Sequence, residues 1–166
     1  MSTKIKITVA DFGTMTAELY PDKAPETVKN FVKLAKEGFF NGLIFHRVIK
    51  GFMIQGGGFT PEFEEKRAQS IKGEFISNGF MSNNLRHTRG VLSMARTSAP
   101  NSASSQFFIM HMDAPHLDGA YAGFGKVVEG IEIVDMIASV KTGSWGWYED
   151  VPRTPVVIES IEVIEE

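Results

Sequence analysis

The residues able to do chemistry in this chain lie on two strand-like runs, FHRVIKGFMIQGG and SQFFIM, which hold polar side chains among apolar ones. Side chains of a strand alternate between two faces, so Met53 shares a face with Gln55, and Gln106 shares one with Phe108. Each run thus presents one amide and one large apolar group to the same side. With Arg47 added, the pattern predicts an apolar pocket edged by two amides and a fixed cation. Such a pocket suits an apolar group attached to a peptide backbone.

Each of these residues also has an ordinary structural explanation when it is taken alone. Arg47 could be an edge-strand residue in a salt bridge, and Gln55 and Gln106 could satisfy buried backbone groups. Phe108 could simply belong to the core. Because the polar and apolar residues fall on matching faces, we favour the binding-site interpretation.

Other chemistries find little support in the motifs. The run GAYAGFGK has Val127 where a phosphate loop needs Ser or Thr, the three consecutive glycines lack the GxGxxG pattern, and no GxSxG elbow occurs. The four histidines have neither zinc-site spacing nor an HExxH motif. We therefore expect no metal site, and we expect His111 and His116 to be ordinary surface histidines.

Four motifs in order, FHRVIKGFMIQGGGF, GVLSMART, SSQFFI and HLDGAYAGFGKV, resemble the cyclophilins, a family of peptidyl-prolyl cis–trans isomerases. The resemblance runs from about Lys4 to Ile164, and the MART form is similar to the bacterial branch. It implies a mainly all-β fold, a closed eight-stranded antiparallel β-barrel capped by two α-helices. It also implies an isomerase that rotates X-Pro bonds in proteins and peptides and assists protein folding.

Rotation of an X-Pro bond needs no covalent step, because the barrier of ~18–20 kcal/mol comes from amide resonance. A guanidinium near the imide nitrogen stabilises the twisted state more than the planar one. The resemblance implies catalytic roles for Arg47, Gln55 and Tyr121, without a cofactor. It further implies that substrate is bound by Phe52, Met53, Ala95, Arg96, Thr97, Gln106, Phe108, His116 and Leu117.

Three positions depart from the best-known eukaryotic members of that family. His116 stands where a tryptophan is common, Tyr121 where a histidine is common, and Arg96 where an asparagine is usual. Tyr121 keeps an aromatic wall and a hydroxyl, so we expect activity to persist. A cyclosporin-type inhibitor, which contacts the rim, is expected to bind with weakened affinity.

Two other functions are compatible with parts of this sequence. A chaperone or scaffold module could bind Pro-containing segments without required catalysis, but binding alone needs only the pocket, so the retained Arg47 argues against it. An unrelated ligand-binding β-barrel would need an internal cavity, whereas the many inward Ile, Val and Phe residues indicate a filled interior.

The elements that position these residues fit one domain over residues 1–166, with a net charge of −3 and no cysteine. This charge gives no basic patch that would indicate binding to nucleic acid or to a membrane. We expect a cytoplasmic monomer that acts on Pro-containing peptides and on unfolded or folding proteins.

Apolar periodicity predicts an opening β-hairpin, a first helix over 24–37 and a short second helix over 131–138. Further strands are predicted over 43–55, 90–95, 105–110, 121–127 and 156–164. A long polar stretch covers 56–89, and the last strand changes parity between Ile158 and Ile161, as at a β-bulge.

Overall fold

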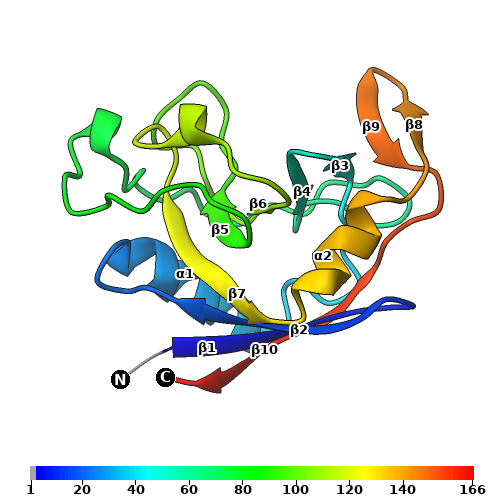
Figure 1. Cartoon of the computed structure of the whole chain (residues 1–166), viewed down its shortest axis with the longest axis horizontal. Coiled ribbons are helices and arrows are strands. Elements are labelled where there is room, and N and C mark those ends of the chain that lie inside the picture. The colour runs from blue at the N-terminus through cyan, green and yellow to red at the C-terminus, as the bar shows by residue number, and fades with distance from the viewer. Residues whose placement is uncertain (1–2) are drawn as a thin grey trace.

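Eight strands form one strongly curled antiparallel sheet in the computed structural model, which describes residues 3–166 (Figure 1). Their order across the sheet is β10-β1-β2-β7-β5-β6-β4-β3. The strands are β1 (Thr3–Val9), β2 (Gly13–Leu19), β3 (Arg47–Ile49), β4 (Met53–Gly56), β5 (Val91–Met94), β6 (Phe107–Met110), β7 (Gly123–Glu129) and β10 (Ile158–Glu165). The predicted eight-stranded antiparallel architecture is confirmed.

The seam between the two edge strands is bridged by the residues that precede β3. Backbone hydrogen bonds run from Phe45 N–H to the Val156 carbonyl, 3.0 Å, and from Ile158 N–H to the Leu43 carbonyl, 2.7 Å. The barrel is therefore a curled sheet whose closure depends on a short connecting segment as well as on strand pairing.

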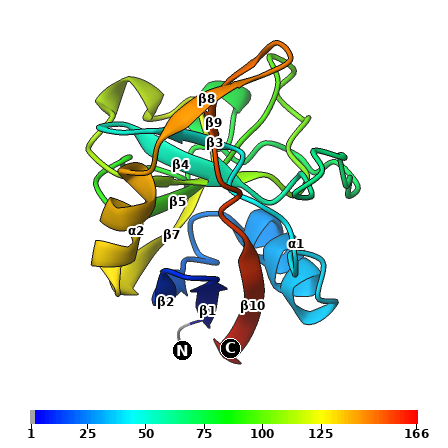
Figure 2. The same ribbon diagram turned by 90° about the vertical axis from the view of Figure 1, so that its right-hand side faces the viewer.

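Two helices pack against the curled sheet on opposite sides of it, as Figure 2 shows. Helix α1 spans Pro25–Lys36 and α2 spans Ile131–Ala138, both close to the predicted ranges. Phe31 of α1 lies in the centre of the core, with its ring centroid 4.8 Å from Phe40, 5.3 Å from Phe107 and 5.1 Å from Phe124. This aromatic group fills the barrel interior, which leaves ligand binding to the outer surface of the sheet.

The N-terminus of α1 is satisfied by a residue far away in the sequence. The buried carboxylate of Glu74 accepts hydrogen bonds from Thr27 N–H at 2.8 Å, Thr27 Oγ1–H at 2.7 Å and Glu26 N–H at 3.2 Å. The first N–H groups of a helix have no partner within the helix, and its dipole favours a negative charge there. Glu74 therefore fastens the long polar stretch to the helix.

The rest of that stretch is held by further long-range hydrogen bonds and one short 3₁₀ turn, η1 (Ile76–Asn78). Ile71 N–H bonds to the Ala103 carbonyl and Ser77 N–H to the Gly119 carbonyl, each at 2.8 Å. The amide of Asn83 donates to two carbonyls, those of Glu74 and Gly123. The stretch lacks regular structure, yet its backbone is anchored at several points.

A second, two-stranded sheet was missed by the sequence prediction. It is the hairpin of β8 (Thr142–Trp145) and β9 (Tyr148–Pro152), which stands apart at the upper right of Figure 1. Its strands have no alternation of buried and exposed residues, so periodicity could not reveal them. The predicted bulge in the last strand is confirmed, because the β1–β10 register shifts beside Val9, which pairs with Ile158.

None of the helices within residues 3–166 is long and apolar enough to cross a membrane.

Candidate functional site

Nine of the twelve predicted site residues line a cavity of about 150 Å³ on the outer face of β3, β4 and β6. Strand register explains the grouping, because Arg47 pairs with Gln55 and Gln55 pairs with Phe108. Paired residues of neighbouring strands point to the same face. The full lining is Arg47, Phe52, Met53, Gln55, Ala95, Arg96, Phe108, Leu117 and Tyr121.

Two amides hold the cation of the site in place. Arg47 Nη1 donates to Gln55 Oε1 at 3.2 Å, and Gln55 Nε2 donates to Gln106 Oε1 at 3.0 Å. Within residues 3–166 no carboxylate forms an ion pair with Arg47, whose side chain is exposed. The guanidinium is thus oriented by a neutral group and keeps its charge available to a ligand.

The apolar walls belong to a small cluster that is separate from the barrel interior. Met53, Phe108 and Leu117 are buried, and the ring of Phe108 meets Tyr121 edge-on with centroids 5.8 Å apart. Phe52 closes the mouth of the cavity from the β3–β4 turn and is half-buried. An apolar ring would therefore find three aromatic rings and the side chains of Met53 and Leu117 beside the cation.

A Ser-His-Asp arrangement lies directly behind Phe108. His87 Nε2 is 2.8 Å from Ser93 Oγ and Nδ1 is 3.2 Å from Asp118 Oδ1. Burial lowers the pKa of His87, although the hydrogen bond and charge of Asp118 oppose that change. Ser93 is 0% exposed, so its hydroxyl cannot reach a substrate. The arrangement supports the pocket wall and does not form a hydrolase site.

Arg96 is fixed by aromatic rings on both sides, which the sequence did not reveal. Its guanidinium lies 4.6 Å from the ring centroid of Phe75 and 4.6 Å from that of Tyr121, and its Nη2 donates to the Ala120 carbonyl at 2.6 Å. Such cation–π contacts favour one position of the ring. Arg96 therefore holds Tyr121 against the cavity.

A second hollow of about 360 Å³ adjoins the first and shares Gln55, Ala95 and Arg96 with it. Thr97 and Gln106, both predicted as site residues, line this second hollow. His116 lines neither. It is exposed on the 3₁₀ turn η2 (Pro115–Leu117), with its ring 5.8 Å from Phe52, at the rim of the smaller cavity.

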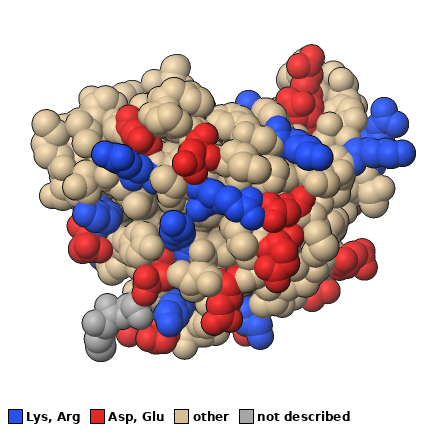
Figure 3. All heavy atoms as spheres, viewed as in Figure 1, with Lys and Arg blue, Asp and Glu red and all other residues tan. Residues whose placement is uncertain are grey.

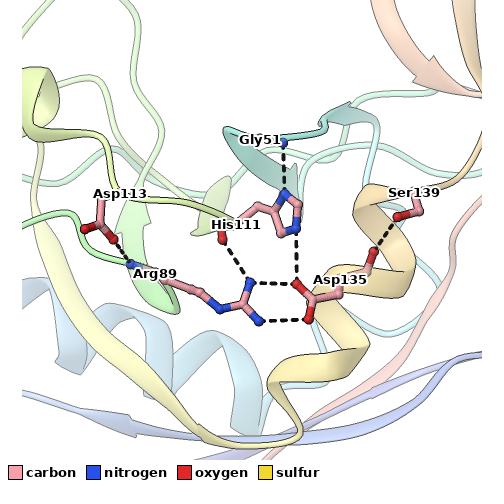
Figure 4. A network of polar contacts seen from close by, with 6 residues as sticks. All are labelled: Gly51, Arg89, His111, Asp113, Asp135 and Ser139. Atoms are coloured by element: carbon pink, nitrogen blue, oxygen red, sulfur yellow. Dashed lines mark hydrogen bonds and ion pairs between the residues drawn. The ribbon is translucent and has the colours of Figure 1, made fainter.

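The turn that carries Phe52 is held by a polar network centred on His111 (Figure 4). His111 Nδ1 accepts from Gly51 N–H at 2.9 Å, and its Nε2 lies 3.1 Å from Asp135 Oδ1. His111 N–H also donates to the Phe52 carbonyl at 2.9 Å. Asp135, on α2, receives two hydrogen bonds from Arg89, at 2.6 and 2.8 Å.

The network fixes the proton positions of His111. Gly51 N–H is a donor, so Nδ1 must be the acceptor and Nε2–H must point to Asp135. The hydrogen bond from Arg89 lowers the pKa of Asp135, which keeps the carboxylate charged. The expectation of a surface histidine was wrong for His111, which is 5% exposed, because its partners lie far away in the sequence.

The comparisons with known proteins identify the family of the chain. The chain matches the family described as cyclophilin type peptidyl-prolyl cis-trans isomerase/CLD over residues 4–163. It is 47% identical over 162 residues to peptidyl-prolyl cis-trans isomerase B of Escherichia coli (strain K12), covering 92% of this chain and 95% of that protein. It is 48% identical over 159 residues to a peptidyl-prolyl cis-trans isomerase of Acinetobacter baylyi, covering 92% of this chain and 81% of that protein.

Solved structures extend the likeness to the whole fold. A cyclophilin type peptidyl-prolyl cis-trans isomerase of Cryptosporidium parvum superposes with a TM-score of 0.82 at 28% identity, covering 100% of this chain and 99% of that one. The structure determined in the presence of the dipeptide Ala-Pro gives a TM-score of 0.80 at 29% identity, covering 98% and 99%.

Proposed function

The chain belongs to the cyclophilin-type peptidyl-prolyl cis–trans isomerases, and from this premise we propose that Arg47 stabilises the twisted imide in a non-covalent mechanism. The isomerase activity itself follows from the family and from the high identity to named isomerases. The observation that carries the proposed mechanism is the Arg47–Gln55–Gln106 chain beside an apolar cavity. Tyr121 completes the catalytic group as the aromatic wall.

The chemistry needs a grip on the proline ring and a donor for the rotated imide. As the bond twists, the nitrogen lone pair leaves conjugation and becomes an acceptor. Arg47, exposed and held by Gln55, donates to that nitrogen and favours the twisted state. Phe52, Met53 and Phe108 grip the ring, together with Leu117. No proton is transferred and no nucleophile is used.

The second hollow extends the site along the substrate backbone. We propose that Ala95, Arg96 and Thr97 bind the part of the peptide that precedes the proline, and that Gln106, which lines the same hollow, hydrogen-bonds to the substrate backbone. The likeness to a protein crystallised in the presence of Ala-Pro supports binding of proline peptides. We propose that the substrates include unfolded and folding proteins, and that neither a metal nor another cofactor takes part. The single-domain organisation, the monomeric state and the cytoplasmic location stay predictions.

An exchange measurement by NMR on an Ala-Pro or Phe-Pro peptide tests this function. We expect the enzyme to accelerate exchange between cis and trans even when a chelator is present. The rate should vary little from about pH 6 to 9, since the mechanism transfers no proton. Binding of the peptide without acceleration would favour a chaperone or scaffold module. Activity that is lost on chelation and restored by zinc would contradict the mechanism.

Replacement of His116 by tryptophan is expected to strengthen inhibition by cyclosporin by about 1–2 kcal/mol. A larger ring on the rim beside Phe52 buries more apolar surface and supplies an indole donor. A short peptide substrate reaches mainly the cavity and Arg47, so its KM should change less than the inhibition constant does. Titration of both proteins with the inhibitor measures the effect, and equal inhibition constants would show that the rim does not control recognition.

The Asp135→Asn change is expected to lower kcat/KM roughly tenfold, the equivalent of ~1.4 kcal/mol. The new amide has one acceptor oxygen, so it cannot keep both hydrogen bonds from Arg89 together with the one from His111 Nε2. This neutral acceptor holds the His111 ring less firmly with its Nδ1 toward Gly51 N–H, so the hydrogen bond to the turn that carries Phe52 is weakened. A shifted amide resonance of Gly51 should accompany the kinetic change.

Asp113→Asn is the matched control for this prediction. Asp113 accepts a hydrogen bond from Arg89 N–H at 2.9 Å, and Figure 4 shows it on the far side of Arg89 from His111. Its loss of charge should leave the Gly51 resonance in place. An equal kinetic effect of the two changes would argue that charge near Arg89, and not the His111 tautomer, controls the turn.

A further inference from the structure

Large aromatic side chains are exposed on the β8–β9 hairpin. Trp147 is 90% exposed at its tip, Trp145 is 54% exposed and Tyr148 is 41% exposed. Together with Phe63 we call these residues the aromatic shelf. Soluble proteins seldom display adjoining aromatic groups without a binding role. The site described above does not use these rings.

The shelf is built by contacts between two segments that are distant in sequence. The ring of Phe63 stacks on Trp145 with centroids 5.4 Å apart and an interplanar angle of 17°, and it lies 4.9 Å from Tyr148. Phe63 has φ of 65° and Asp150 of β9 has φ of 60°. Such left-handed backbone is unfavourable for residues other than glycine and is concentrated at functional positions. The rings of Trp145 and Tyr148 are thus held in place by Phe63, and Trp147 adds a further exposed ring beside them.

The shelf packs against the strand that carries Arg47 through the preceding residue, His46. His46 is buried, and its ring lies 4.6 Å from Phe59 and 6.2 Å from Phe63. β3 is the last strand of the large sheet, and Cα atoms of β9 come within 8 Å of those of β3. The shelf therefore lies just beyond the edge that presents Arg47.

A second connection leads from the shelf to the other hollow. Phe63 is followed by Glu65 and Arg67, and both of these residues line the hollow of about 360 Å³. Figure 3 shows the upper surface dipping between the hairpin and the lobe at the upper left. A peptide that occupies the site can thus continue onto the shelf without leaving the surface.

We propose that the aromatic shelf is a second binding region for the same substrate chain, and this rests on the isomerase function proposed above. Its ligand is an extended segment a few residues from the isomerised proline that carries a leucine or a second proline. Rigid aromatic faces bind such segments at a low entropic cost, as in the aromatic grooves that recognise proline-rich peptides. The distance from the proline site to the shelf, taken as two strand spacings plus the gap to β9, is roughly 18 Å. About six extended residues span this distance.

The shelf makes the enzyme sensitive to substrate length. A tetrapeptide fills the cavity and meets Arg47, but it cannot reach Trp147. A longer unfolded chain contacts both regions, and its second contact raises affinity through a high effective concentration. Long apolar chains are therefore bound more tightly than short peptides with the same X-Pro bond.

Peptides of different length test the proposal. The probes are the tetrapeptide Ala-Ala-Pro-Phe and peptides with the same core, extended by about eight residues on either side with Leu and Pro or with Ser and Gly. We expect the Leu/Pro extension on one of the two sides of the core to lower Kd roughly tenfold relative to the Ser/Gly extension on that side. Trp147→Ser alone, and Trp145→Ser with Trp147→Ser, should remove this preference while the tetrapeptide rate stays unchanged. Trp147 is almost fully exposed, so its replacement leaves the packing intact.

Ile164→Ser is the matched control, because Ile164 is 50% exposed near the C-terminal end of β10, which lies at the bottom of Figure 1, whereas the hairpin stands at its top. It should keep the preference for the Leu/Pro extension. Equal Kd values for the two kinds of extension in the parent protein would overturn the proposal. So would a dimer in sedimentation that the Trp147 change dissociates, since the shelf would then bind a second copy. Failure to isomerise the tetrapeptide would refute the proposed function, while the Kd values would still decide the shelf.

Discussion

Replacement of Arg47 by alanine is expected to lower kcat/KM by about two decades or more, the equivalent of roughly 3 kcal/mol at ~1.4 kcal/mol per decade. The catalysis rests on one interaction that is stronger in the twisted state than in the planar one, and Arg47 supplies it. The cavity that grips the proline ring remains in the variant. We therefore expect most of the loss in kcat and little change in peptide affinity.

The fold should survive this change, because Arg47 is exposed on an edge strand and its hydrogen-bond partner Gln55 keeps a second partner in Gln106. Arg86→Ala, which removes another exposed arginine, is the control for the loss of a surface charge. NMR exchange rates measured below and at saturating peptide give kcat/KM and kcat separately. An alanine variant that isomerises at the parent rate would disprove the mechanism.

A pH-dependent loss of stability is the second large effect that we expect, and His46 causes it. Burial, and then the charge of Arg47, lower the pKa of His46 from 6.5 to about 4. The unfolded chain binds a proton between these two values and the folded chain does not. The stabilisation is therefore complete above about pH 6.5 and is lost as the pH falls to about 4. It amounts to about 3 kcal/mol at ~1.36 kcal/mol per pKa unit.

Urea unfolding at several pH values between 7 and 4 measures this contribution. His46→Phe keeps an aromatic ring against Phe59 but removes the titrating group, so its stability should fall less steeply on acidification. His116→Phe, at an exposed position, is the control for replacing a histidine. Parallel curves for the parent protein and the His46 variant would contradict the expectation.

The sequence predicts the residues of the site better than it predicts the contacts that hold those residues in place. Strand alternation is local, so it correctly placed Met53 and Gln55 on one face, and the resemblance implied that Arg47 belongs to the same site. The pairing that brings Arg47 and Phe108 beside Gln55 is a property of the folded sheet. The position of Arg96 between two rings depends on a loop that arrives from far away. The burial of His111 depends likewise on α2. No short-range pattern contains these contacts.

The β8–β9 hairpin is a part of the fold that short-range sequence patterns likewise could not predict. Its strands are short and mostly exposed, and its pairing has a register shift between Gly143 and Trp145. A strand without a buried face leaves no period of two in the sequence. Its position beside β3 is determined by tertiary packing, which only the folded chain reveals.

The anchoring of the long polar stretch has a consequence for how this scaffold can diversify. Glu74 ties it to α1, Ile71 and Ser77 tie it to neighbouring loops, and Asn83 joins it to the start of β7. Successive anchored residues are only a few residues apart, and lengthening the loop between two of them costs little, since doubling a loop adds only ~0.6 kcal/mol. Insertions between two ties would thus alter the surface beside the pocket while the frame of the catalytic strands stays unchanged. Such spans are natural places to graft new recognition segments onto the enzyme.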